Sequence, residues 1–185
     1  MKIFIIHGAY GSPQENWFPW LKDKLEEKGH TVFVPNFPTP ENQSLSSWMK
    51  VFEDNFNSID EDTIFVGHSL GPAFILSILE KLSILKPIRA CFFVAGFIGL
   101  LCNEEFDKIN ETFTKKEFDW EKIKKTCNNF YLFNSTNDPY VPLEKGEELA
   151  EKLNGELIKM DNAGHFNEDA GYNKFEEILK YIENE

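Results

Sequence analysis

The sequence predicts an α/β fold, a single domain (1–185) built on a mostly parallel sheet of about six strands flanked by helices. Short apolar runs rich in β-branched and aromatic residues recur, each followed by a turn signal and then a helical pattern, as in βα units. Most runs are continuously apolar rather than alternating, which indicates a sheet covered on both faces. A length of 185 residues and 42% hydrophobic content suit one packed core.

The strand candidates, in chain order, are 2–6, 31–34, 63–66, 90–95, 129–133 and 156–160. Stretches with the apolar spacing of a helix lie between and after them, at 17–28, 45–57, 70–82, 120–126, 143–153 and 173–182. Gly29 and Gly155 each follow a helical stretch, where we expect a left-handed C-terminal stop. The segment 103–121, rich in Glu, Lys and Asp, interrupts the alternation. We expect a small excursion over the end of the sheet and no large lid domain.

Charge and composition limit the partners. The formal net charge of −12 repels phosphate backbones and anionic lipid headgroups, so we expect neither nucleic acid nor a membrane as partner. The apolar run at the start is too short for a signal peptide, which favours a cytoplasmic protein. Three cysteines, Cys91, Cys102 and Cys127, lack metal-ligand spacing, and we expect reduced thiols and no metal or cofactor. Whether the protein has a protein partner is left open by the sequence.

A G-x-S-x-G motif with Ser69 at its centre, Gly67 to Gly71, directly follows the strand candidate 63–66 and precedes a helical stretch. A serine in such a strand-to-helix turn has a strained backbone, and the flanking glycines leave room for the turn. Its hydroxyl projects at the carboxyl end of the sheet, where the helix N-terminus favours developing negative charge. An ordinary turn is the alternative, because short motifs also arise by chance. The setting favours a nucleophilic serine.

A serine nucleophile needs a base to take its proton. Of the four histidines, His7 and His30 precede the serine and His68 lies inside the motif. His165 remains, on a loop after the last strand candidate. The chain order Ser, Asp, His of this kind of site requires the base at such a place.

The expected acid is Asp138, which follows the fifth strand candidate. Its carboxylate would hold His165 in the required tautomer and stabilise the imidazolium. The alternative is that Asp138 serves no catalytic purpose and only forms an Asx turn before Pro139. Asp161 and Asp169 are rivals on the histidine's own loop, but strand-end placement and chain order favour Asp138.

The tetrahedral intermediate of such a reaction needs two N–H donors. We expect the first from the backbone of Leu70, the residue after the serine. The second should come from the loop 7–12, where we favour Ala9, with Tyr10 as the rival donor. Aromatic residues that could line the site are Tyr10, Trp17, Phe18, Trp20 and Phe97, although core packing is the commoner role of aromatics.

With these residues placed, the chain resembles the small α/β-hydrolases of the retinoblastoma-binding protein 9 family, also called the YdeN-like family. The likeness covers nearly the whole chain and rests on the segments 7–12, 36–40, 67–71, 119–123, 135–139 and 164–166. It implies an α/β-hydrolase fold with a compact six-stranded sheet and no large cap. It also implies a triad of Ser69, Asp138 and His165 acting on small esters or amides.

We therefore expect a serine hydrolase that cleaves a small carboxylic ester or amide through an acyl-enzyme on Ser69. The alternative is a catalytically idle hydrolase fold that serves as a binding module, because a fold does not set function by itself. The residues do not separate an esterase from a peptidase or amidase.

Overall fold

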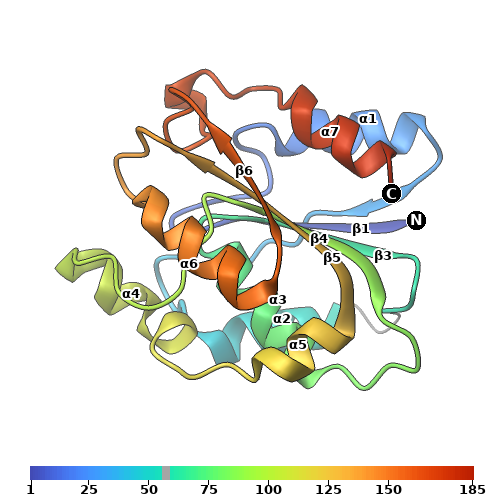
Figure 1. The fold of residues 1–185 in the computed structure, drawn as a ribbon, viewed down its shortest axis with the longest axis horizontal. Coiled ribbons are helices and arrows are strands. Elements are labelled where there is room, and N and C mark those ends of the chain that lie inside the picture. Colours follow the sequence, from blue (N-terminus) through green and yellow to red (C-terminus); the bar gives the residue numbers. More distant parts are fainter. Residues whose placement is uncertain (56–58) are drawn as a thin grey trace.

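A six-stranded parallel sheet forms the centre of the computed structural model, which describes residues 1–55 and 59–185 (Figure 1). The strand order is β2-β1-β3-β4-β5-β6, and every pairing is parallel. The strands are β1 (Lys2–Ile6), β2 (Thr31–Phe33), β3 (Thr63–His68), β4 (Ile88–Val94), β5 (Cys127–Ser135) and β6 (Glu156–Met160). The predicted sheet is confirmed, with β3, β4 and β5 longer than the apolar runs indicated.

Helices cover both faces of the sheet, with α1 and α7 on one face and α2, α3, α5 and α6 on the other (Figure 1). Their bounds are α1 (Phe18–Glu27), α2 (Leu45–Asn55), α3 (Gly71–Lys81), α4 (Glu104–Thr114), α5 (Trp120–Thr126), α6 (Leu143–Leu153) and α7 (Glu176–Glu183), with a short 3-10 helix η1 (Glu168–Ala170). The last two residues of the predicted helix 45–57 lie outside the described residues. Among those that are described, no helix has both the length and the apolar character to cross a membrane.

The two faces of the sheet pack into separate cores. On β1, Ile3 and Ile5 contribute to the core beneath α1 and α7, whereas Phe4 and Ile6 contribute to the core on the opposite face. All six residues of β3 are buried. Because both faces are covered, strands of this sheet have no polar side to alternate with the apolar one, which explains the continuous apolar runs in the sequence.

Helix α3 is the most enclosed of the described helices and directly follows the G-x-S-x-G motif. It is buried from Gly71 to Leu79. Phe74 packs edge-on against four rings, with ring centroids 5.0 Å from Phe37, 5.3 Å from Trp48, 6.2 Å from Phe52 and 6.3 Å from Phe113. This aromatic cluster ties α3 to α2 and α4, and it fixes the helix whose N-terminus begins the candidate site.

The segment 103–121 contains a helix that the sequence analysis did not predict. Asn103 caps α4, because its Oδ1 accepts the backbone N–H groups of Glu105 and Phe106 at 3.1 and 3.2 Å. The inner side of α4 buries Asn110 and Phe113. The connection from β4 to β5 holds only α4 and α5 as helices in the described chain, so the expected small excursion without a large lid domain is confirmed.

One of the two predicted glycine stops is wrong. Gly29 has a φ of +82°, as expected. After α6 the left-handed residue is Asn154 (φ 53°), and Gly155 serves a different purpose. A Cβ on Gly155 would lie 2.6 Å from Leu132 Cδ1, so glycine is needed there for close packing against β5.

The three cysteines carry free thiols, as the sequence predicts. Cys91 and Cys127 are buried on neighbouring strands with their Sγ atoms 3.6 Å apart, while Cys102 is exposed. Burial raises the pKa of the Cys91 thiol well above its usual value, with the Cys127 thiol adding to the effect. Cys91 is therefore a protonated packing residue and a poor nucleophile.

The aromatic cluster around α3 is testable by truncation. Phe74→Ala removes a fully buried ring and should lower the free energy of unfolding by about 3 to 5 kcal/mol, measured by urea denaturation. Leu85→Ala is the matched control, because Leu85 is fully exposed and its truncation should change stability by less than about 0.5 kcal/mol. Similar losses for the two variants would argue against the cluster.

Candidate active site

Ser69 lies in the turn between β3 and α3 with a backbone conformation that side chains rarely adopt. Its φ is 58°, in the left-handed region, which is strained for a residue other than glycine. Its N–H donates to the carbonyl of Val94 at 2.9 Å, so the end of β4 holds the turn. The predicted strained serine at a strand-to-helix turn is therefore present.

Three glycines leave the space that this turn needs. A Cβ on Gly67 would lie 2.8 Å from the backbone nitrogen of Pro72, and one on Gly71 would lie 2.5 Å from the carbonyl oxygen of Ile6. A Cβ on Gly8 would lie 2.8 Å from Ser69 Cβ. The turn, the end of β1 and the loop after β1 are thus in close contact around the serine.

His165 and Asp138 form a buried pair beside this turn. Nδ1 of His165 lies 2.8 Å from Oδ2 and 3.1 Å from Oδ1 of Asp138. The histidine side chain is 11% exposed and the aspartate side chain 1%. Oδ1 of Asp138 also accepts the N–H groups of Tyr140 and Val141 at 2.9 and 3.0 Å. The Asx turn considered as an alternative therefore exists together with the histidine contact, and it fixes the carboxylate.

The rival carboxylates do not contact the histidine. Asp161 instead accepts a hydrogen bond from the Thr136 hydroxyl at 3.2 Å. Asp169 lies on the pocket wall and makes no hydrogen bond to His165 in the described part of the chain. Geometry therefore pairs His165 with Asp138.

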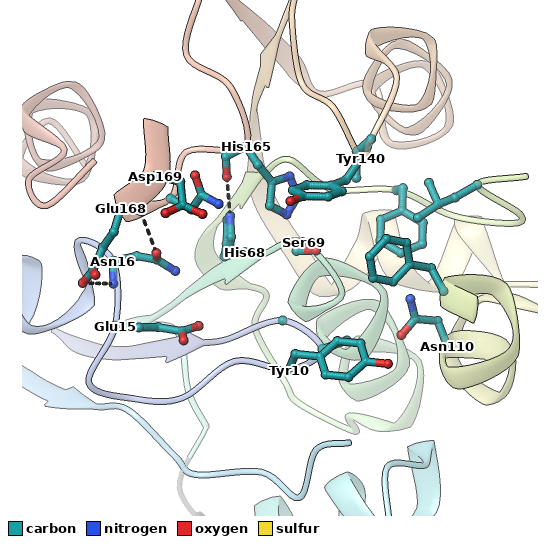
Figure 2. Close-up of a pocket in the computed structure, with 17 residues that line it drawn as sticks. Tyr10, Glu15, Asn16, His68, Ser69, Asn110, Tyr140, His165, Glu168 and Asp169 are labelled. Atoms are coloured by element: carbon teal, nitrogen blue, oxygen red, sulfur yellow. Dashed lines mark hydrogen bonds between the residues drawn. The ribbon is translucent and has the colours of Figure 1, made fainter. Parts of the chain in front are cut away.

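Ser69 and His165 line the same pocket, as Figure 2 shows. With Nδ1 on Asp138, the free ring atom of His165 is Nε2. In the described residues no hydrogen bond joins the Ser69 hydroxyl to this ring. Such contacts are often long or poorly aligned without a bound substrate and tighten when one binds.

His68, set aside as a base from its place in the motif, supports His165 from below. Its Nε2 donates to the His165 carbonyl at 2.8 Å, drawn as a dashed line in Figure 2. Burial, with a smaller contribution from His165, lowers the pKa of His68 to about 3. His68 is therefore neutral at physiological pH and cannot serve as a cationic group.

His7 has a matching place under the loop 7–12. Its Nε2 accepts the backbone N–H of Phe37 at 3.0 Å, so the ring hydrogen is on Nδ1, which donates to the Gly8 carbonyl at 2.8 Å. Burial lowers the pKa of His7. The neutral ring thus fixes the loop that carries the expected second N–H donor.

The expected N–H donors are free and the rival is not. Among the described residues, the backbone N–H groups of Leu70 and Ala9 have no hydrogen-bond acceptor. The N–H of Tyr10 donates to Thr39 Oγ1 at 2.7 Å. Ala9 is accordingly the better placed of the two candidates on this loop.

The pocket around Ser69 has a volume of about 470 Å³ and two chemically different sides (Figure 2). One side is aromatic, with Phe106 packed against both Tyr10 and Tyr140. Phe97, Leu101 and Val141 complete the apolar lining of the pocket. Tyr140 stands edge-on to His165 with ring centroids 5.0 Å apart. The expectation that Tyr10 and Phe97 line the site agrees with this arrangement. Leu101 and Phe106 were not among the expected lining residues, and Phe106 lies on the unpredicted helix α4.

The other side of the pocket carries three carboxylates, Glu15, Glu168 and Asp169. Burial, aided by the charge of Glu168, raises the pKa of Glu15, while the Ser12 N–H lowers it. The carboxylates do not form a metal site: no group of three or more His, Cys, Asp or Glu side chains in the described residues could hold a metal ion.

The expectation for Trp17 is corrected by the structure. Trp17 and Phe18 are fully buried in the core under α1, and neither they nor Trp20 reach the pocket. Trp17 Nε1 donates to the carbonyl of Phe166 at 3.0 Å. Trp17 thus supports the histidine loop from within the core.

Comparison with known proteins agrees with this geometry. A model of the serine hydrolase family matches residues 3–184. The chain is 32% identical over 171 residues to YdeN of Bacillus subtilis (strain 168), covering 92% of this chain and 88% of that protein. It is 28% identical over 184 residues to the serine hydrolase RBBP9 of Rattus norvegicus, covering 98% and 93%.

A solved structure extends the similarity to three dimensions. The crystal structure of the B. subtilis ydeN gene product superposes with a TM-score of 0.92 at 29% identity, covering 99% of this chain and 97% of that one. The family resemblance and the α/β-hydrolase fold expected from the sequence are confirmed. This chain belongs to the serine hydrolase family and is an enzyme of that class.

Proposed function

We propose that this enzyme cleaves small carboxylic esters or amides, with Ser69 as nucleophile, His165 as general base and acid, and Asp138 as the acid of the triad. The observation that supports the proposal best is the buried His165–Asp138 pair at 2.8 Å in the same pocket as the strained Ser69. A pocket of about 470 Å³ suits a small substrate.

In the first half of the reaction, Ser69 Oγ attacks the substrate carbonyl and its proton passes to His165 Nε2. Asp138 accepts the Nδ1–H of the ring, which keeps the lone pair on Nε2 and stabilises the imidazolium that forms. The leaving alcohol or amine then takes the proton from Nε2. An acyl group remains on Ser69 Oγ.

Negative charge on the carbonyl oxygen is stabilised by the free N–H groups of Leu70 and Ala9. A fixed donor of this kind typically lowers the barrier by about 3 kcal/mol. The bond from His7 to the Gly8 carbonyl holds the Ala9 peptide in position before substrate arrives.

In the second half of the reaction, His165 takes a proton from water, which attacks the acyl group on Ser69. The carboxylic acid is released, and the proton on His165 returns to Ser69 Oγ.

His68 acts as a positioning residue in this scheme. Its Nε2–H fixes the backbone carbonyl of His165, so the base is held from the backbone by His68 and from the ring by Asp138. A neutral ring is required, because a charged His68 would repel the imidazolium that His165 becomes.

Ser69→Ala tests the nucleophile. Because the hydroxyl forms the covalent intermediate, its removal should abolish labelling by a fluorophosphonate probe and lower the rate of p-nitrophenyl acetate hydrolysis by at least about 1,000-fold. Ser83→Ala is the matched control, because Ser83 lies on an exposed loop after α3, and this variant should behave as wild type. Equal labelling of Ser69→Ala and wild type would sink the assignment, and an unlabelled wild type would favour the binding-module alternative.

Asp138→Asn tests the acid against its rivals. The amide keeps the shape but favours the wrong imidazole tautomer, so kcat should fall by about 1,000- to 10,000-fold. Asp161→Asn removes the rival carboxylate that does not contact His165, and kcat should stay within about twofold of wild type. A large loss for Asp161→Asn with little change for Asp138→Asn would reverse the assignment.

The neutral state of His68 predicts a pH dependence of stability. Its pKa is about 3 in the folded chain and near the ordinary 6.5 when unfolded, so the unfolded state binds the extra proton between these values. The contribution of neutral His68 to the free energy of unfolding is therefore fully present above pH 6.5. It is lost as the pH falls from there toward the folded-state pKa, by up to ~1.4 kcal/mol per pH unit. His68→Gln keeps an N–H donor and does not titrate. Its free energy of unfolding, measured in urea from pH 7 to pH 4, should fall less steeply; equal slopes would contradict a buried neutral His68.

A further inference from the structure

Asn110 is a buried polar side chain on the otherwise apolar side of the pocket. It lies on α4, is 3% exposed, and lines the pocket together with Leu101 and Phe106. Figure 2 shows its side chain extending from α4 into the space that Ser69 and Tyr10 also face. Its Oδ1 accepts a hydrogen bond from Gln43 Nε2 at 2.9 Å, and its Nδ2 has no partner in the part of the chain that the structure describes.

The orientation of this amide is fixed by a chain of hydrogen bonds. Gln43 Nε2 also donates to the backbone carbonyl of Ile109 at 3.0 Å, and a carbonyl can only accept. The Gln43 side-chain atom that faces Ile109 and Asn110 must therefore be its nitrogen. Because this nitrogen donates to Asn110, the Asn110 atom that faces Gln43 must be its oxygen. The other end of Gln43 agrees, since its Oε1 accepts the Thr39 hydroxyl at 2.5 Å.

The same chain of bonds reaches the loop near Ser69. Thr39 Oγ1 accepts the Tyr10 N–H at 2.7 Å while its hydroxyl donates to Gln43. Both hydrogens of Gln43 Nε2 are used, on Ile109 and Asn110. Asn110 therefore directs two unused N–H donors toward the pocket, where the neighbouring aromatic and aliphatic side chains offer no strong acceptor. Nδ2 of Asn110 is not among the side-chain atoms of the described residues that are both closed off from solvent and unpaired, so it is open to the pocket, where a ligand acceptor can reach it.

The charges of the pocket narrow the ligand further. Glu15, Glu168 and Asp169 carry carboxylates on the opposite side of Ser69, and the chain has a net charge of −12. These charges oppose the entry of an anion. A neutral oxygen, in a ketone or an ether, is the acceptor that suits Asn110.

We infer that Asn110 determines substrate specificity by donating its Nδ2–H to a neutral carbonyl or ether oxygen in the apolar part of the substrate. The substrate class is then an ester or amide with an apolar chain that carries a second oxygen, separate from the scissile carbonyl. Gln43 acts as a positioning residue that keeps the donor aimed at the pocket. The inference rests on the proposed function for the identity of the scissile group.

The test compares binding of methyl hexanoate with that of methyl 4-oxohexanoate and methyl 5-oxohexanoate to the Ser69→Ala variant, by NMR titration. Ser69→Ala keeps the pocket without turning the esters over. The measured quantity is the preference ratio, the Kd of methyl hexanoate divided by that of each oxo ester. Adding Asn110→Leu should lower this ratio about 3- to 10-fold for at least one oxo ester.

A second variant keeps Asn110 and changes its orientation. In Gln43→Glu the carboxylate cannot donate, so Asn110 turns its Nδ2 toward residue 43 and its Oδ1 toward the pocket. The preference ratio should fall as it does in Asn110→Leu, a result that a merely structural Asn110 would not produce. Glu111→Gln, on the exposed side of α4, should leave the ratio unchanged.

A ratio that stays within twofold in both variants overturns the inference, as does the absence of measurable binding by all three esters. If Asn110→Leu does not fold, the preference ratio of Gln43→Glu alone tests the inference. Because the titration needs no turnover, the two proposals fail separately. An active enzyme with an unchanged ratio rejects only the role of Asn110. If the variants change the preference ratio but the wild-type protein cleaves no ester or amide, only the proposed function is rejected.

Discussion

The close contact between the turn at Ser69 and the end of β1 is the constraint on which the rest of the site depends. Ser69 is left-handed in the turn, and the helix after it begins at Gly71, which lies so close to the Ile6 carbonyl that a side chain there would clash. Gly8 must in turn lack a side chain because Ser69 occupies that space. This contact brings the first strand's loop against the serine, so the two proposed N–H donors, Ala9 and Leu70, come from segments distant in the sequence. Burial of α3 on nearly all sides holds the turn in place.

Two buried, neutral histidines connect this turn to the two loops that flank it. His7 fixes the loop after β1 through the Gly8 carbonyl, and His68 fixes the loop after β6 through the His165 carbonyl. Each histidine donates a ring N–H directly to a backbone carbonyl of the loop, with no second side chain between the ring and the loop. Their low pKa values follow from the same burial that makes their hydrogen bonds strong. The site is therefore assembled by residues that take no part in bond making or breaking.

Much of this could be predicted from the sequence, because parallel strands buried on both faces leave continuous apolar runs and because the motif at Ser69 has a defined place in a βα unit. The role of Trp17 could not, since an aromatic residue near a site and one in the core have the same local pattern. Helix α4 was missed although Phe106, Asn110 and Phe113 have helical spacing, because polar residues surround them. Asn110 and Gln43 are 67 positions apart, and no local pattern links them.

Helix α4 supplies part of the pocket wall, through Phe106 and Asn110, in a chain without a large lid domain. The helix is tied to α3 through Phe113, to the loop after β1 through the 2.8 Å bond from Tyr10 to Glu105, and to α2's leading segment through Gln43. The Glu105 bond also raises the pKa of Tyr10, so the phenol stays protonated as the donor. The residues of the proposed triad, Ser69, Asp138 and His165, follow β3, β5 and β6, which α4 does not build. If Ser69 and Asn110 act as proposed, changes in 103–121 should alter which substrate is accepted and leave the chemistry at Ser69 the same, because the two roles belong to different elements.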